Sequence, residues 1–195
     1  MKRDALEKLI KCKNSNTRKP LIMRGARQVG KTWLLKKFGK DEYDKLVYVN
    51  FEATPSLKEI FTTDLNVERI VSILEIHSGV KITPSNTLII FDEIQEAPSG
   101  LSSLKYFCED TPELHVVAAG SLLGLSMPHK SSFPVGKVDF LDLNPMSFLE
   151  FLSALEKQKL ADAILSKSWK IIDVFHEELI NHLKTYYFVG GMPEV

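Results

Sequence analysis

Eight residues near the N-terminus, 25–32, read GARQVGKT and fit the pattern G-x-x-x-x-G-K-[ST]. The two glycines let the backbone curl around a phosphate, so that successive N–H groups face anionic oxygens. The lysine reaches the β- and γ-phosphates, and the hydroxyl that follows is a ligand for Mg²⁺. A glycine-rich turn without a ligand is the alternative. We predict a phosphate-binding loop formed by Gly25, Ala26, Arg27, Gln28, Val29, Gly30, Lys31, Thr32 and Trp33.

Two adjacent carboxylates, Asp92 and Glu93, follow the apolar run 88–91. Ligands of open α/β sheets bind beyond the carboxyl ends of the strands, so we expect Asp92 to hold Mg²⁺ opposite Thr32. Glu93 is expected to point elsewhere and to orient or deprotonate an attacking water. Two solvated charges at a strand end are the alternative, and the preceding phosphate loop favours the functional interpretation.

These residues need a scaffold, and the hydrophobic pattern predicts one. Residues 3–13 have the spacing of an amphipathic helix, and the apolar run 21–23 leads into the loop. Further strands are expected at 46–51, 87–91, 114–119 and 138–143, the last near an edge, with helices at 31–38, 56–62, 67–77 and 101–109. This alternation predicts a three-layer α/β fold with a mainly parallel sheet and right-handed crossovers. Beyond residue 145 we expect helices at 147–155, 160–165 and 171–188, with apolar side chains packed in a core.

The composition excludes several other classes of protein. The 25 Lys and Arg balance the 25 Asp and Glu, and hydrophobic residues make up 44%, which excludes a disordered or polybasic chain. Neutral charge also argues against autonomous nucleic-acid binding, which needs clustered Lys and Arg. The N-terminus lacks the continuous apolar core of a secretory signal, and the longest uncharged run is too short to cross a membrane. The two cysteines have no metal-ligand spacing, so we expect a cytoplasmic protein without a membrane partner.

The chain resembles the prokaryotic AAA-type ATPases of the AAA_14 type, which carry a C-terminal domain of unknown function, DUF4143. The resemblance covers about residues 18–195 and rests on the runs RGARQVGKTWLL, LIIFDEIQ, AAGSLLG, SFPVGKVDFLDLNPMSFLEFL and FVGGMPEV. It implies a P-loop NTPase sheet of five strands in the order 5-1-4-3-2, with strand 114–119 as the additional strand. It also implies that Ser121 takes the sensor-1 position, in contact with the γ-phosphate or the attacking water; a strand-capping Gly-Ser turn is the alternative. Gln95 is a weaker candidate beside the acidic pair.

The resemblance also implies a domain organisation. We expect an N-terminal helix, 1–17, packed on an ATPase domain, 18–144, and a helical segment, 145–195, that leads to a C-terminal domain. Relatives continue well past GGMPEV, so the chain is expected to lack that domain. Partners of the chain would then be ATP and either further copies of the chain or another protein.

The arginines of the chain depart from the family pattern. AAA-type ATPases commonly use an arginine after the acidic pair to stabilise the transferring phosphoryl group, but no arginine follows Arg69. Lys137 stands where relatives often carry arginine, and lysine cannot provide a planar bidentate contact. Arg24 and Arg27 could contribute from within the same chain, although a solvated or acid-paired side chain is the simpler interpretation of each.

We therefore predict Mg²⁺-dependent ATP hydrolysis, with Lys31, Glu93 and Ser121 as catalytic residues and Thr32 and Asp92 as metal ligands. Hydrolysis would drive or gate a C-terminal effector, and turnover by this segment alone is expected to be weak. One alternative is a nucleotide-gated interaction module with negligible turnover, which the missing arginines favour. Another is the ATPase part of a DNA-handling protein.

Overall fold

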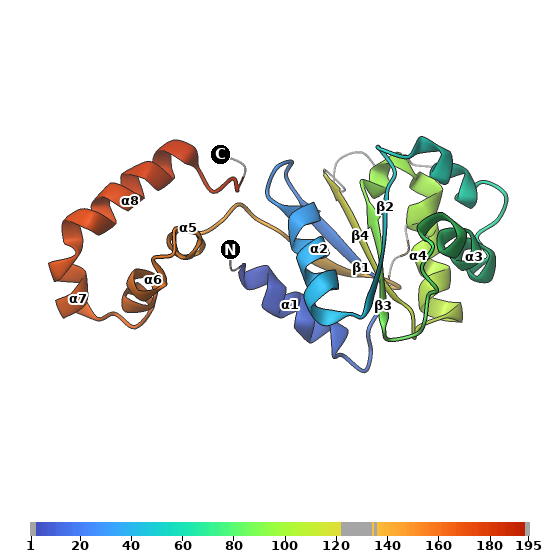
Figure 1. Cartoon of the computed structure of the whole chain (residues 1–195), viewed down its shortest axis with the longest axis horizontal. Coiled ribbons are helices and arrows are strands. Elements are labelled where there is room, and N and C mark those ends of the chain that lie inside the picture. The colour runs from blue at the N-terminus through green and yellow to red at the C-terminus, as the bar shows by residue number, and fades with distance from the viewer. Residues whose placement is uncertain (1–2, 122–133, 135, 194–195) are drawn as a thin grey trace.

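The computed structural model describes residues 3–121, 134 and 136–193 and contains a parallel β-sheet with helices on both faces (Figure 1). Within the described residues the sheet has five strands: β1 (Leu21–Gly25), β2 (Lys45–Asn50), β3 (Thr87–Asp92), β4 (His115–Ser121) and β5 (Asp139–Asp142). Their order is β2-β3-β4-β1-β5, and every neighbouring pair is parallel. The predicted fold class and strand order are confirmed, including the placement of β4 between β1 and β3.

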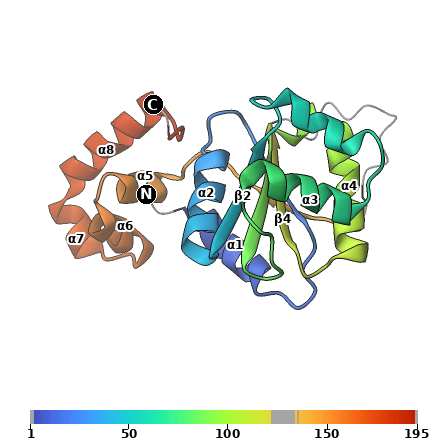
Figure 2. The same ribbon diagram turned by 45° about the vertical axis from the view of Figure 1, so that its right-hand side comes forward.

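The helices form the two outer layers, which Figures 1 and 2 show from two directions. One layer contains α1 (Asp4–Lys13) and α2 (Lys31–Glu42), and the other contains η1 (Pro55–Phe61), α3 (Val67–Ser78), η2 (Ile94–Glu96) and α4 (Pro98–Asp110). The helix predicted at 56–62 is present as η1, a tighter 3₁₀ helix with a proline in its first turn. No helix in the described part of the chain is long and apolar enough to cross a membrane.

The layers are held by two hydrophobic clusters on opposite faces of the sheet. Alternate strand residues point to opposite faces, so Ile89 and Phe91 pack with α3 and α4 while Leu88 and Ile90 pack with α1 and α2. Because both faces are covered, every residue of β3 and β4 is buried. This explains why these strands are apolar without alternation.

An aromatic group fixes the end of β3. The Phe91 ring lies 5.6 Å from the ring of Phe51, 5.8 Å from that of Phe61 and 6.0 Å from that of Phe107, measured between centroids. Phe91 is fully buried and directly precedes Asp92. Its packing therefore fixes the point at which the acidic pair leaves the sheet.

The helices after the sheet form a separate arm, α5 (Phe148–Ala154), α6 (Gln158–Leu165), α7 (Trp169–Val174) and α8 (His176–Val189). Figure 1 shows this arm to one side of the sheet, beyond α1 and α2. Its apolar residues pack on one another, so the expected core is a small one within the arm, around Leu152 and Leu179. Ile171 and Phe175 remain 46% and 42% exposed.

The single helix predicted over 171–188 is wrong, because the chain bends at Phe175 between α7 and α8. Phe175 has φ −102° and ψ 19°, outside the α-helical range. The bend lets α8 pack against α5, where the Tyr186 ring contacts Phe148 and Phe151. Tertiary packing therefore overrides the continuous helical spacing of the sequence.

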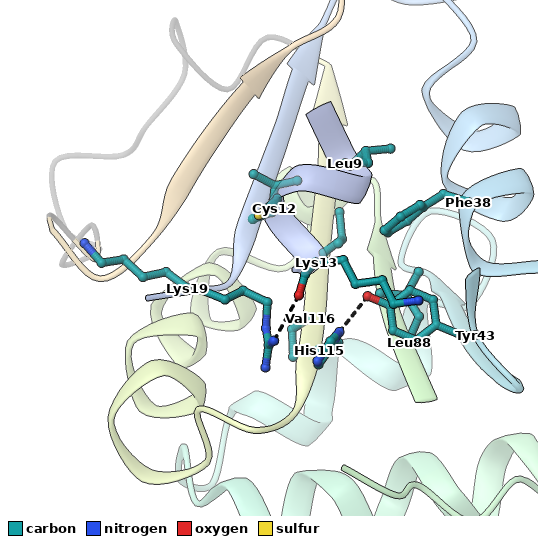
Figure 3. Close-up of a pocket in the computed structure, with 12 residues that line it drawn as sticks. Leu9, Cys12, Lys13, Lys19, Phe38, Tyr43, Leu88, His115 and Val116 are labelled. Carbon is teal, nitrogen blue, oxygen red and sulfur yellow. Dashed lines mark hydrogen bonds between the residues drawn. The ribbon is translucent and has the colours of Figure 1, made fainter. Parts of the chain in front are cut away.

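A small pocket lies at the amino ends of the strands, opposite the phosphate loop (Figure 3). In it, the Tyr43 hydroxyl and His115 Nδ1 are hydrogen-bonded at 2.6 Å, with Leu9 and Phe38 among the lining residues. Burial lowers the pKa of His115 to about 4 and raises the pKa of Tyr43. His115 is only 5% exposed, so the pocket holds a neutral imidazole at neutral pH.

Removing the Phe91 ring tests the packing behind the acidic pair. Phe91→Ala should lower the free energy of unfolding by about 3–5 kcal/mol, because it leaves a cavity among three aromatic rings. Urea denaturation measures this loss. Phe188→Ala is the matched control, because its side chain is 92% exposed and the change should cost within about 0.5 kcal/mol. Equal effects of the two substitutions would contradict the packing described.

His115 should make stability depend on pH in a defined window. The unfolded chain takes up a proton near the ordinary pKa of 6.5, whereas the folded chain does so near 4. The free energy of unfolding should therefore fall as the pH drops from 6.5 towards 4, by up to about 3 kcal/mol from this residue. Urea denaturation across this range should show a smaller dependence for His115→Gln than for the wild type. His77→Gln, which alters an exposed histidine, should behave like the wild type.

Candidate functional site

The phosphate loop connects the end of β1 to the start of α2. Each of its two glycines is required for a different structural reason. Gly30 has φ +88°, in the left-handed region that favours glycine, and it caps the N-terminus of α2. Gly25 lies against the main chain after β5, where a Cβ would overlap the carbonyl oxygen of Leu143. The loop therefore needs glycine once for its conformation and once for a close approach.

Lys31 lies inside the loop. Its Nζ donates to the carbonyl oxygens of Gly25 at 3.0 Å and Ala26 at 2.6 Å, and the residue is only 6% exposed. Burial lowers the pKa of Lys31, and the charges of Glu93 and Asp92 act in the opposite direction. The ammonium group is therefore held by two neutral carbonyl acceptors within the field of the acidic pair.

Thr32 and Asp92 meet directly across the site. Thr32 Oγ1 donates to Asp92 Oδ2 at 2.7 Å, and the N–H of Glu93 donates to Asp92 Oδ1 at 3.1 Å. Asp92 is 1% exposed. Hydroxyl and carboxylate oxygens are the ligands that Mg²⁺ prefers, and Mg²⁺ usually takes its other ligands from water and substrate phosphates. The two side chains thus fit a magnesium ion, and the described residues contain no cluster of three or more His, Cys, Asp or Glu that could hold a metal.

Glu93 turns away from Asp92 at the end of β3. Its φ of 52° lies in the left-handed region, a conformation that is uncommon for a residue other than glycine. Gln95 Nε2 donates to Glu93 Oε2, while Gln95 Oε1 is buried and has no hydrogen-bond partner among the described residues. The Glu93 carboxylate lies close enough to Lys31 for its charge to oppose the lowering of the pKa of that lysine by burial. Thr32, in contrast, is hydrogen-bonded to Asp92.

Ser121 lies beside the start of the phosphate loop. It is the last residue of β4, pairs with Gly25 in the parallel register and is 5% exposed. Parallel strands end at the same edge of a sheet, which brings Ser121, the loop and the acidic pair together. Residues 122–124, the end of the AAGSLLG run, lie outside the described residues.

Two of the predicted loop residues, Arg27 and Trp33, have side chains directed outward. Arg27 is exposed, and its charge contributes to lowering the pKa of Lys31. Trp33 is 41% exposed and lines a shallow recess on α2 with Lys36 and Lys37. The structure therefore places Arg27 in the loop and Trp33 in the first turn of α2, with both side chains at the outer surface.

The other basic candidates lie outside the site. Arg24 forms a bidentate ion pair with Asp142, with N–O distances of 2.7 and 2.8 Å. Lys137 Nζ lies 2.9 Å from Glu109 Oε1, just before β5 and therefore at the opposite edge of the sheet from the loop. This ion pair raises the pKa of Lys137. Neither residue reaches the phosphate loop of its own chain.

Tyr48 is a site residue that the sequence analysis missed. Its hydroxyl donates to Asp92 Oδ2 at 2.8 Å, beside Thr32 Oγ1, and Lys36 Nζ lies 3.9 Å from the centroid of its ring. Burial raises the pKa of Tyr48 to about 12, so the hydroxyl remains a donor. The sequence does contain one indication of this role. Tyr48 lies two residues before the end of β2, and this strand pairs with β3, which carries Asp92.

Comparison with known proteins identifies the class of protein. Residues 17–152 match the family model described as an AAA domain. The match covers more than half of the chain, so the chain belongs to this family of P-loop ATPases. No curated protein sequence is significantly similar to it.

Solved structures show the same fold. The chain resembles a subunit in the structure of Drosophila ORC bound to DNA, with a TM-score of 0.59, 18% identity, and coverage of 96% of this chain and 56% of that one. It also resembles the Walker-type ATPase of Pyrococcus abyssi, with a TM-score of 0.49, 15% identity, and coverage of 84% and 62%. At 18% identity the likeness to the Drosophila structure shows the fold alone. The chain spans 56% and 62% of the lengths of these two proteins.

Tyr48→Phe should weaken metal binding while leaving the fold intact. It removes one of the two hydroxyl donors that hold Asp92 Oδ2, and loss of such a supporting contact typically costs at least about tenfold in metal affinity. The Mg²⁺ concentration for half-maximal binding in a titration of the protein should rise by about that factor. Tyr106→Phe, a partly buried tyrosine packed on the other face of the sheet, should leave it unchanged. An unchanged Mg²⁺ dependence in Tyr48→Phe would show that Tyr48 does not position Asp92.

Proposed function

We propose that this chain binds ATP with Mg²⁺ and hydrolyses it to ADP and phosphate. One observation carries the proposal: a buried lysine inside a glycine-bounded loop faces a hydroxyl–carboxylate pair, Thr32 and Asp92, at the carboxyl edge of the sheet. Membership of the AAA family supports the general activity. The residues proposed to hold the nucleotide phosphates are Gly25, Ala26, Arg27, Gln28, Val29, Gly30, Lys31, Thr32 and Trp33.

In the proposed complex, Lys31 exchanges one kind of acceptor for another. Its ammonium group leaves the carbonyl oxygens of Gly25 and Ala26 and donates to the β- and γ-phosphates. The main-chain N–H groups of the loop and the N-terminus of α2 bind the remaining phosphate oxygens. The main-chain donors of the loop and of α2 are held by the fold, so Lys31 is the group that must change partners to stabilise charge on the phosphates.

Thr32 and Asp92 would hold Mg²⁺ through the two oxygens that are hydrogen-bonded to each other in this structure. An ion held by these two side chains would supply positive charge beside the phosphates. Tyr48 keeps its hydrogen bond to Asp92 Oδ2 and so restricts rotation of the carboxylate. In this proposal Thr32 and Asp92 are the metal ligands, and Tyr48 fixes the orientation of the Asp92 carboxylate.

Glu93 is the residue proposed to act on water. The water oxygen attacks the γ-phosphorus, Glu93 orients the water and accepts its proton, and the bond to the β-phosphate oxygen breaks to release ADP. Gln95 Nε2 donates to Glu93 Oε2 in this structure. To reach the water, Glu93 must break this hydrogen bond or keep it while its other oxygen accepts from the water. Ser121 contacts the γ-phosphate or the same water in this proposal.

We further propose that hydrolysis is coupled to an effector through the helical segment. The proposed parts are an N-terminal helix, 1–17, an ATPase domain, 18–144, and the segment 145–195, which would connect to a C-terminal domain of the DUF4143 type. The structure of Drosophila ORC, to which the fold is similar, includes DNA. The net charge of zero gives no support for DNA binding by this chain alone.

A nucleotide-gated interaction module with little turnover is the second candidate. The paired state of Arg24 and Lys137 favours it, because neither side chain is available to the phosphates of its own chain. Without a second positive group, such as an arginine, beside Lys31 at the γ-phosphate, catalysis lacks an effective transition-state contact. A neighbouring copy of the chain could supply such a group, and turnover would then increase with protein concentration.

Two substitutions separate binding from catalysis. Lys31→Ala should abolish measurable ATP binding and turnover, because it removes the only lysine inside the loop. Glu93→Gln should retain ATP binding in calorimetry and lose roughly 100-fold or more in turnover, the usual contribution of a positioned base. Glu59→Gln, an exposed glutamate on η1, is the control and should match the wild type.

The same assay decides between the two candidate functions. ATP turnover per chain that rises with protein concentration would support an ATPase completed by a second copy. ATP binding without phosphate release at every concentration would contradict hydrolysis and favour the nucleotide-gated module. If Glu93→Gln hydrolyses ATP as fast as the wild type, the role assigned to Glu93 is wrong.

A further inference from the structure

Arg3, far from the phosphate loop in sequence, is buried against it in the fold. It is 3% exposed and directly precedes α1, whose first turn faces the helical arm in Figure 1. Each of its nitrogens contacts a different part of the chain. Nε donates to Glu150 Oε1 at 3.0 Å, Nη1 to the Val29 carbonyl at 3.0 Å and Nη2 to the Asn144 carbonyl at 2.7 Å. One side chain thus connects the N-terminus, the phosphate loop, the end of the sheet and α5.

Glu150 fixes the position of Arg3. Its Oε1 also accepts from the N–H of Asp4 at 2.9 Å, and its Oε2 accepts from the N–H of Ser147 at 2.9 Å, as part of the cap of α5. A buried ion pair is maintained only when its remaining polar groups are hydrogen-bonded, and removing one partner is costly. All the donors and acceptors around this pair come from fixed main chain or from the pair itself. The guanidinium group therefore has one available position.

The contact with Val29 fixes one peptide of the loop. A trans peptide is planar, with its C=O and the next N–H pointing in opposite directions, and no peptide in the described residues is cis. Arg3 Nη1 holds the Val29 carbonyl on the outside of the loop, so the N–H of Gly30 points to the inside. The Val29 side chain is fully buried, which prevents the peptide from turning. A cationic donor also makes this a charge-assisted hydrogen bond, stronger than a neutral one.

The C-terminal part of the described chain lies on the same outer side of the loop. A Cβ placed on Gly30 would lie 3.3 Å from Pro193 Cγ and 3.8 Å from Arg3 Nη1. Met146 donates its N–H to the carbonyl of Gly191 at 2.7 Å, which attaches the end of α8 to the start of the helical arm. The phosphate loop is therefore supported by segments from both ends of the chain.

We propose that Arg3 is a positioning residue for the phosphate loop. It orients the Val29–Gly30 peptide so that the Gly30 N–H faces the bound phosphates, and its ion pair with Glu150 makes that orientation depend on the docked helical arm. The inference rests on the proposed function, because the ligand is the phosphate chain of ATP. It adds a physical connection between the nucleotide site and the segment that would lead to an effector.

Arg3→Lys and Arg69→Lys form a matched pair of variants. Arg69 also bonds a carboxylate and main-chain carbonyls, through Asp64 at 2.9 Å and Ile60 at 2.7 Å, but it lies on α3 on the other face of the sheet. Lysine keeps the positive charge but cannot reach three separate acceptors as the guanidinium fork does. Glu150→Gln changes the same contact from the helical arm and nearly preserves shape. It serves as the second test if Arg3→Lys does not fold.

The experiment measures ATP affinity by calorimetry and the Gly30 amide signal in glycine-¹⁵N-labelled protein. Arg3→Lys should bind ATP about tenfold more weakly, and Glu150→Gln should change affinity in the same direction, because the loop is no longer preorganised. Arg69→Lys should stay within about twofold of the wild type. ATP should move the Gly30 amide proton of the wild type downfield, as a hydrogen bond to a phosphate does, and by less in Arg3→Lys.

Folded Arg3→Lys and Glu150→Gln proteins with wild-type affinity and a wild-type Gly30 shift would overturn the inference. Weaker binding with an unchanged Gly30 shift would also overturn it, because the loss would then come from general destabilisation. A wild-type protein that binds no ATP would contradict the proposed function itself, and this outcome is distinguished by the wild-type titration alone.

Discussion

Parallel pairing of β1, β3 and β4 is the constraint on which the candidate site depends. Because these strands end at one edge, the loop after β1, the acidic pair after β3 and Ser121 at the end of β4 lie together although they are distant in sequence. The pairing of Gly25 with Ser121 sets this arrangement on one side. On the other, the aromatic rings around Phe91 fix the strand end from which Asp92 and Glu93 emerge.

Lys31, Thr32, Asp92 and Glu93 each have a hydrogen-bond partner within the site. Lys31 is held by loop carbonyls, and Asp92 by the hydroxyls of Thr32 and Tyr48. Gln95 donates to Glu93. Burying such groups unpaired would cost free energy, so a ligand must replace each bond that it breaks. A triphosphate with a divalent cation carries the required groups, since phosphate oxygens accept from Lys31 and a cation can take the oxygens of Thr32 and Asp92.

The local and periodic features of this protein could be predicted from its sequence. The loop motif, the strands and the acidic pair depend on residue types within a few positions, and family resemblance supplied the strand order. Tyr48 was missed because strand alternation does not show which side chain reaches Asp92. Arg3 was missed because its partner Glu150 is 147 residues away and only the tertiary fold brings them together. The bend at Phe175 was missed for the same reason, since packing of α8 on α5 decides it.

The central claim is that the loop at 25–32 binds the phosphates of ATP with Lys31 inside it. A crystal structure of the chain with Mg²⁺ and a non-hydrolysable ATP analogue tests this most directly. In that structure Lys31 Nζ should lie on phosphate oxygens instead of the carbonyls of Gly25 and Ala26, and the metal should replace the Thr32–Asp92 hydrogen bond. Crystals grown at saturating analogue in which Lys31 still bonds those carbonyls, with no phosphate in the loop, would contradict it.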